Sequence, residues 1–218
     1  MSDAVFAQMV ATTTGLMLVT AILQVWRQSL TASIRLLAVQ GAALAALVAT
    51  IGLAERESEA VAVAGLVLAV KAGLIPWALT RTARLTGATR EDAPLVNPTA
   101  GLLVAALLTG LAYVVSVPIS EALGPDAGTA AVGLAMVLIG FLVLVSRRTA
   151  LSQLIGFVVL DNGIATVAFL TSGGVPLVVE LGVTLDVLLV VLILQVLASR
   201  MRLTHGGLDL DDLRELHD

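Results

Sequence analysis

Residues 150–197 read ALSQLIGFVVLDNGIATVAFLTSGGVPLVVELGVTLDVLLVVLILQVL, two apolar segments of membrane-spanning length joined by a short TSGG connection. The first segment carries Asp161 near its middle, and the second carries Glu180 in its first third and Asp186 near its middle. An ionised side chain at the centre of a lipid-facing helix costs at least about 2.5–3.5 kcal/mol, so such residues normally face protein or water and mark ion pathways. The stretch therefore predicts a helical hairpin in a membrane, with its acids held away from lipid.

The composition of the whole chain is that of an integral membrane protein. Of its 218 residues, 58% are hydrophobic and 13% are charged, and the mean hydropathy is +1.02. Charged residues make up about 25% of an ordinary soluble domain. A chain of this length has room for about seven spans of ~20 residues and for little else. We therefore expect an all-α, multi-pass protein of the cell's inner (plasma) membrane.

The same composition excludes several classes of function. The chain has no cysteine, which excludes disulfides, iron–sulfur ligation and thiol chemistry. Both histidines, His205 and His217, lie in the polar C-terminal tail, so no span offers the imidazole pair of a membrane haem. A net charge of −4 gives no basic surface for nucleic acid. We expect no catalytic residue, cofactor or metal in this chain.

Apolar runs bounded by charges predict about seven helices and no strands. The predicted helices are Val5–Trp26, Ser33–Leu53, Ala60–Thr80, Leu95–Ile119, Thr129–Val145, Ala150–Leu170 and Val175–Leu197. The N-terminal MSDAVFAQMV lacks a basic region before its apolar run, so we interpret it as the start of a retained first helix. Trp26 and Trp77 are interpreted as interfacial anchors, and Gly156 and Gly163 as points of close helix contact.

Basic residues in the connections predict the orientation. The connections after the first, third and fifth helices and the C-terminal tail contain Arg27, Arg35, Arg81, Arg84, Arg90, Arg147, Arg148, Arg200, Arg202 and Arg214. The opposite connections contain no Lys or Arg except Arg56, which lies among Glu55, Glu57 and Glu59. Because basic loops stay in the cytoplasm, the N-terminus is predicted outside and the C-terminus inside.

One basic residue, Lys71, lies within a predicted span, in AVAVAGLVLAVKAGLIPWAL. At 1.5 Å per residue, Lys71, Asp161 and Asp186 each lie about eleven residues from the predicted membrane entry, near the midplane. We therefore predict a row of ionisable groups that carries an ion. Glu180 lies nearer the outer face and is turned roughly 120° from Asp186, so it serves either the row or a different neighbour. The alternative for the acids is a purely structural hydrogen bond between helices.

Further polar residues accompany this row. Gln40, Gln153, Asn162 and Thr184 either extend a hydrogen-bonded chain or serve only helix packing. Lys71 either neutralises an acid or alternates between charged and neutral forms. Pro76 removes the amide that would bond the Ala72 carbonyl, which predicts a helix bend beside Lys71 or, alternatively, only a shaped helix end.

The chain is expected to divide into three units, a three-helix unit over residues 1–82, a connector with the fourth helix over 83–128 and a second three-helix unit with a cytoplasmic tail over 129–218. Both three-helix units start outside and have a basic cytoplasmic turn, and Gln40 falls close to the level of Asp161. These features fit a parallel repeat. Chance similarity between apolar, alanine-rich segments is the competing explanation.

Two family resemblances rest on these residues. The block RRTALSQLIGFVVLDNGIATVAFLTSGG, followed by VVELGVTLDVLLVVLILQVLASRMRL, resembles the K-type subunit of respiratory complex I, with Asp186 in the place of the acid of its last helix. The K-type family has an acid two residues after Gly156, where this chain has Val158. The overall length, Lys71 followed by Pro76, and the Asp161–Asn162 pair are similar to component E of formate-hydrogenlyase-type hydrogenases.

The resemblance implies a membrane subunit of an energy-converting complex, placed beside antiporter-like and other membrane subunits and peripheral redox subunits. Iron–sulfur, nickel–iron or quinone sites would belong to those partners. The resulting hypothesis is translocation of protons or Na⁺ through Lys71, Asp161 and Asp186, coupled to redox chemistry in partner chains. The alternatives are a scaffold subunit that conducts no ion and a stand-alone small ion transporter.

Overall fold

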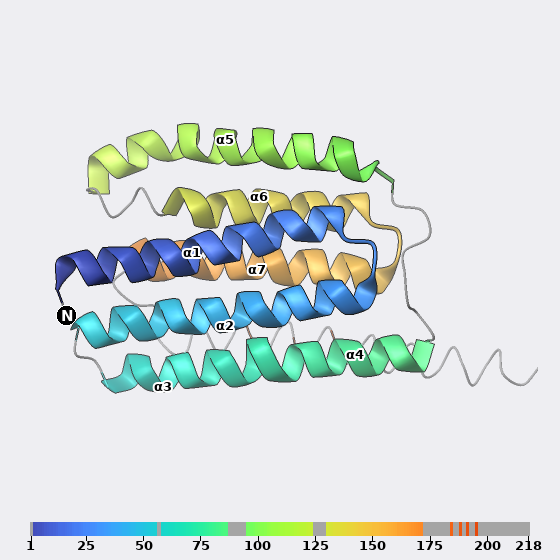
Figure 1. Ribbon diagram of the computed structural model, residues 1–218, viewed down its shortest axis with the longest axis horizontal. Helices are drawn as coiled ribbons and strands as arrows, with labels where there is room; N and C mark the ends of the chain where they lie inside the picture. The colour runs from blue at the N-terminus through green and yellow to red at the C-terminus, as the bar shows by residue number, and fades with distance from the viewer. Residues whose placement is uncertain are drawn as a thin grey trace, which may run out of the picture.

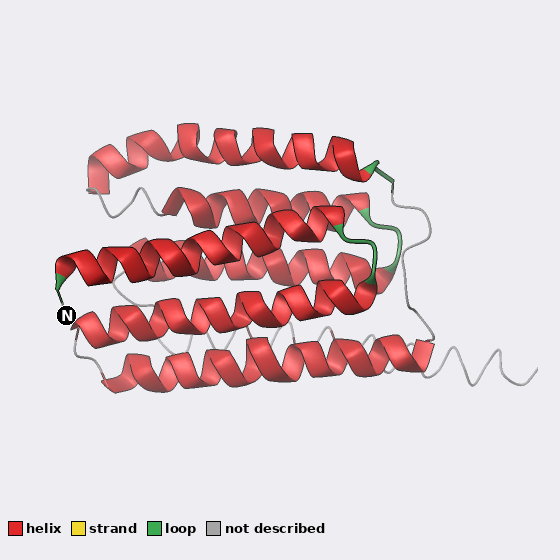
Figure 2. Ribbon diagram, in the orientation of Figure 1, coloured by secondary structure: helices red, strands yellow, loops and turns green. Residues whose placement is uncertain are grey.

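The protein is an all-helical bundle in the part of the chain that the structure describes (Figures 1 and 2). This computed structural model describes residues 2–55, 58–86, 95–123 and 130–171, with Thr184, Leu188, Val191 and Gln195. The helices are α1 (Asp3–Trp26), α2 (Leu30–Glu55), α3 (Ser58–Val67), the π-helix η1 (Leu68–Leu74), α4 (Ile75–Thr86), α5 (Pro98–Leu123), α6 (Ala130–Ser146) and α7 (Ala150–Thr171). The segments α3, η1 and α4 follow one another as a single rod (Figure 1).

The lengths and apolar character of these helices suit a bilayer. Within the described ranges, 5 helical stretches are long and apolar enough to cross a membrane, and α6 is a shorter apolar helix. A helix satisfies its backbone amides and carbonyls internally, which hydrocarbon requires. Threonine hydroxyls are satisfied in the same way, because each donates to the carbonyl four residues earlier. This holds at Thr12, Thr14, Thr50, Thr80, Thr82, Thr109 and Thr171.

Helix α2 occupies the centre of the bundle. It packs against α1 on one side and against α3, η1 and α4 on the other, and it also contacts α7 (Figure 1). Helix α7 packs most extensively against α6, and α5 lies at the outer edge against α6 and α1. The polar side chains of α2 can therefore contact those of α1 and α7, although α7 is far from both in the sequence.

Four glycines bring α6 and α7 into close contact. Gly133 and Gly140 lie seven residues apart on α6, and Gly156 and Gly163 lie seven residues apart on α7. A β-carbon at any of the four would lie within 3.0 Å of an atom of the facing helix, closer than real β-carbons come. Small residues at such a seam allow backbones to approach in a membrane. The predicted role of Gly156 and Gly163 is confirmed.

Several predicted helix boundaries were wrong. Helix α5 begins at Pro98 and not at Leu95, because Asn97 caps it by accepting the Thr99 amide at 3.0 Å, and proline suits the first helical position. The same helix continues past Pro118 to Leu123. The predicted third helix does not end at Thr80, since α4 runs to Thr86.

The predicted seventh helix lies outside the described residues, apart from four positions. Thr184, Leu188, Val191 and Gln195 are helical, and their spacing of four, three and four residues places them on one helix face. Gln195 donates from Nε2 to the Ala78 carbonyl at 3.3 Å. The count of seven spans, the orientation, the three units and the parallel repeat stay predictions.

Candidate functional site

An ion pair lies in the interior of the bundle. Lys71 of η1 and Asp161 of α7 are separated by 90 positions in the chain, and the Lys71 Nζ lies 2.7 Å from the Asp161 Oδ2. Lys71 is 1% exposed and Asp161 is 4% exposed. Removing two charges from water is costly, and a charge-assisted hydrogen bond at this distance offsets part of that cost. The structure therefore brings together two of the three members of the predicted ionisable row.

The lysine is carried by a π-helical turn. In η1 the Ile75 amide donates to the Val70 carbonyl, five residues earlier, where an α-helix would use the residue four earlier. Pro76 follows at once and has no amide to donate, so the helix register is already interrupted at this point. Lys71 therefore lies in a widened turn, and a bend of the helix at Pro76 stays a prediction.

Helix α2 packs directly on this turn at Gly41. A β-carbon at residue 41 would lie 2.6 Å from the Lys71 carbonyl carbon and 2.8 Å from the Ala72 nitrogen. Any larger residue would push the two backbones apart. Gly41 therefore sets the position of the Lys71 backbone relative to α2.

A hydrogen-bonded cluster adjoins the ion pair. Asn162, which follows Asp161 on α7, donates from Nδ2 to the Gln40 Oε1 at 3.0 Å, and the Gln40 Nε2 donates to the Met17 carbonyl at 3.1 Å. Thr166 donates to the Asn162 carbonyl at 2.7 Å. The predicted common level of Gln40 and Asp161 thus corresponds to a contact between Gln40 and the next residue, Asn162.

The other predicted residues fall elsewhere. Gln153 lies near the start of α7 and donates from Nε2 to the Arg147 carbonyl at 3.0 Å, so it supports the α6–α7 turn and does not join the Lys71 cluster. Thr184 is buried and helical. Glu180 and Asp186 lie outside the described residues, and a role for them in the row stays a prediction.

Residues that the sequence did not single out complete the surroundings. Met17 contributes a backbone carbonyl, and Gly41 allows close packing because it has no side chain. No pattern of polar residues in the sequence reveals either role. Thr166 lies one helical turn after Asn162, and that spacing was the available signal. In the described part of the chain, no group of His, Cys, Asp or Glu side chains could hold a metal ion.

Arg147 is a buried residue at the basic end of the bundle. It follows α6, and its Nη2 donates to the carbonyls of Gln24 and Arg27, each at 2.8 Å, and of Val25 at 3.2 Å. These carbonyls belong to the end of α1, where helical partners run out. The predicted loop charge therefore also caps a helix and joins the α6–α7 turn to the α1–α2 turn.

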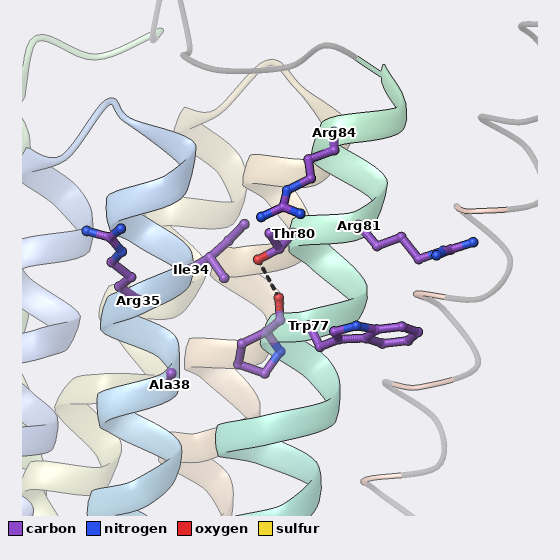
Figure 3. A pocket seen from close by; sticks show the side chains of 8 residues that line it. Ile34, Arg35, Ala38, Trp77, Thr80, Arg81 and Arg84 are labelled. Carbon is purple, nitrogen blue, oxygen red and sulfur yellow. Dashed lines mark hydrogen bonds between the residues drawn. The ribbon is translucent and has the colours of Figure 1, made fainter.

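A groove of about 490 Å³ lies between α2 and α4 (Figure 3). Its lining includes three arginines, Arg35, Arg81 and Arg84, together with apolar residues such as Ile34, Ala38 and Pro76. Arg84 is directed toward α2, whereas Arg81 is directed the opposite way, with its guanidinium 5.8 Å from the centre of the Trp77 ring (Figure 3). The arginines diverge, so the groove presents no convergent set of donors for one anion. Trp77 is 59% exposed, as an interfacial anchor requires.

Curated proteins similar to this chain match it along nearly its whole length. Uncharacterized protein Rv0085 of Mycobacterium tuberculosis is 44% identical over 221 aligned positions, which cover 100% of both chains. Hydrogenase-4 component E of Escherichia coli is 30% identical over 206 positions, 93% of this chain and 94% of that protein. The protein of the same name from Shigella flexneri matches equally well. No family model and no solved structure matches the chain significantly.

Proposed function

This chain belongs to the family of hydrogenase-4 component E, and from that premise we propose that it is a membrane subunit of a hydrogenase-like, energy-converting complex. The several apolar helices of spanning length support a place within the membrane part of such a complex. Neighbouring antiporter-like membrane subunits and peripheral redox subunits are its partners. Iron–sulfur, nickel–iron or quinone chemistry belongs to those partners, and the lack of cysteine in this chain supports that division for the metal clusters.

Within the complex, the Lys71–Asp161 pair is a station on an ion translocation path. The observation that carries this proposal is an ion pair of 2.7 Å between two almost fully buried side chains in an apolar bundle. Apolar residues of similar volume often replace a buried ion pair at no cost in stability, so stability alone is a weak reason for the pair. Charged side chains inside membrane segments are costly and mark ion and proton pathways.

The chemistry available to the pair is movement of one proton or one small cation. A proton leaving the Lys71 ammonium toward the Asp161 carboxylate converts a charged pair into a neutral one, without change in the total charge. When redox events in a partner change a nearby charge, the balance between these two states changes. Lys71 and Asp161 can thereby pass a proton between neighbouring groups, and Asp186 is the proposed next group along the row.

The decisive experiment replaces the pair by apolar residues and measures proton translocation. The double variant Lys71→Met with Asp161→Leu removes both charges and leaves no buried charge unpaired. The intact complex carrying it is reconstituted in membrane vesicles, and proton uptake is measured together with electron transfer. Translocation is expected to be lost while the amount of assembled complex stays normal. A matched control, Arg148→Ala, changes an exposed charge at the basic end and is expected to leave translocation unchanged.

The competing scaffold function predicts the opposite result for the double variant. If the charges only join η1 to α7, an apolar pair that restores packing preserves both assembly and translocation. Normal proton uptake by the assembled double variant would therefore overturn the proposal. Purification of the chain as an isolated oligomer that transports ions without partners would instead favour a stand-alone transporter.

A further inference from the structure

Two buried amide oxygens in the bundle have no hydrogen-bond partner among the described residues, and both belong to side chains at the α1–α2–α7 seam. They are the Oε1 of Gln24, which is 2% exposed, and the Oδ1 of Asn162, which is 0% exposed. Buried polar atoms of native proteins nearly always have a partner, and ordered water supplies it where protein does not. Each of these oxygens is therefore a candidate position for an ordered water.

The Gln24 end has space for that water. A cavity of about 10 Å³ lies between the α1–α2 turn and the α6–α7 turn, and Gln24, Ser33 and Ser152 are among its lining residues. This is about the size that one water molecule needs. A buried water needs two to four polar partners, and the polar residues Gln24, Ser33 and Ser152 of the lining are available for that role. The cavity lies at the basic end of the bundle, which the arginines predict to be cytoplasmic.

A regular pair of cross-links leads from this cavity into the interior. The Gln24 Nε2 donates to the Ser33 carbonyl at 2.9 Å, and the Gln40 Nε2 donates to the Met17 carbonyl at 3.1 Å. Gln24 and Met17 are separated by seven residues on α1, as are Ser33 and Gln40 on α2, so the two cross-links lie about 10.5 Å apart along the helices. The inner cross-link ends on Asn162, beside Asp161.

Thr20 fills the interval between the two cross-links. It is the sole polar residue between Leu18 and Leu23, it is buried, and its Oγ1 donates to the same Met17 carbonyl at 2.8 Å. It lies one turn from Gln24 on the same helix face, so a water at the Gln24 oxygen would have the Thr20 hydroxyl as a neighbour. The polar groups thus follow one another from the cavity to Asn162, with one interval, between Gln24 and Thr20, that a water has to fill.

We propose that Gln24, Thr20, Gln40 and Asn162 form the hydrated path by which protons pass between the basic end of the bundle and the Lys71–Asp161 pair. The inference rests on the proposed translocation function and specifies its route. The amide side chains hold waters in place, and the waters and the Thr20 hydroxyl carry the proton. One proton enters from water at the basic end, and each carrier accepts one proton and releases another, so the carriers end unchanged. To pass its proton on, the Thr20 hydroxyl turns its hydrogen away from the Met17 carbonyl, and a water at the Asn162 oxygen delivers the last proton to the Asp161 carboxylate.

The experiment compares two threonines of α1. Thr20→Val removes a hydroxyl on the proposed path, and Thr14→Val removes a buried hydroxyl on the far side of Met17 from the basic end. Both hydroxyls donate to a carbonyl of their own helix, Thr14 to Val10 at 2.7 Å and Thr20 to Met17 at 2.8 Å, so each substitution removes a buried hydroxyl bonded within α1. In the reconstituted complex, Thr20→Val is expected to slow proton uptake several-fold, and Thr14→Val is expected to leave it unchanged. Gln24→Leu is expected to act like Thr20→Val.

The outcomes separate this route from the proposed function. If the Lys71→Met with Asp161→Leu variant loses translocation but Thr20→Val and Thr14→Val behave alike, the route is overturned and the function stands. If the apolar pair translocates normally, the function itself fails. A map of the assembled complex that resolves ordered waters gives an independent readout should a variant not assemble, because dry Gln24 and Asn162 oxygens would overturn the route.

Discussion

Gly41 lies against the backbone of Lys71, so closely that a β-carbon at residue 41 would be 2.6 Å from the Lys71 carbonyl carbon. The position of the buried ammonium therefore depends on a residue of α2 that carries no chemistry of its own. Helix α2 also holds Gln40, the next residue back, whose side chain bonds Asn162. Both halves of the site, the ion pair and the amide cluster, are fixed relative to each other by these adjacent positions.

Gly41→Ala is expected to destabilise the protein by about 1–3 kcal/mol, because the added methyl group forces the η1 backbone away from α2. A matched control is Gly65→Ala on α3, where an added β-carbon meets nothing within 4 Å. Thermal unfolding in detergent checks the difference between the two variants. Equal melting temperatures for both would show that α2 and η1 are not packed as described.

Removal of one partner of the ion pair is expected to cost far more than removal of both. Lys71→Met alone leaves a buried carboxylate without its ammonium, and the loss should be about 3–5 kcal/mol. In the double variant with Asp161→Leu, most of that loss should be recovered. Denaturant unfolding of the single and double variants measures the recovery. If the double variant is as unstable as the single one, the cost does not come from an unpaired charge.

From the sequence we could predict that the protein is all-helical, with several apolar helices of spanning length, and that Lys71 and Asp161 are neighbours. Apolar runs of spanning length identify helices directly. A lysine and an aspartate at the same depth on different helices have few other polar groups with which to bond, because their surroundings are apolar. Lys71 and Asp161 accordingly meet. Boundaries were less predictable, since the cap that Asn97 supplies to α5 depends on a local turn and not on hydropathy.

The details of the site depend on how each helix is rotated about its axis and on its register against its neighbours. The depth of a residue in the membrane determines neither. Nothing in the hydropathy pattern distinguishes the π-helical turn of η1 from an α-helix, although Pro76 signals an interruption. Gln153 is polar and close in sequence to Asp161, but it lies at the turn with Arg147. The positive-inside rule accounts for an arginine in the loop at position 147. It predicts neither the burial of that arginine nor its bonds to α1.

The bridge between Gln40 and Asn162 is expected to show strong coupling in a double-mutant cycle. Gln40→Leu leaves the buried Asn162 Nδ2 without its acceptor, which costs about 1–3 kcal/mol, whereas the Met17 carbonyl keeps the Thr20 hydroxyl as a donor. Asn162→Leu added to Gln40→Leu should cost less than the two single changes summed, since the shared bond is lost once. Unfolding free energies of the three variants give the coupling. Simple additivity would contradict a direct bond between the two side chains.

Arg147→Ala is expected to loosen the basic end of the bundle, because it removes the donor to the carbonyls of Gln24, Val25 and Arg27 at once. Unsatisfied buried carbonyls cost about 1–3 kcal/mol each, and water entering the turn should reduce the total. Arg148→Ala is the matched control, because it removes the same charge from the same turn at an exposed position. Amide hydrogen exchange checks the prediction locally: the last turn of α1 should exchange faster in Arg147→Ala than in Arg148→Ala. Since Gln24 lies in that turn, faster exchange there would also show that Arg147 holds the α1 end of the seam in place, whereas equal exchange in the two variants would mean that charge alone accounts for the arginines of this turn.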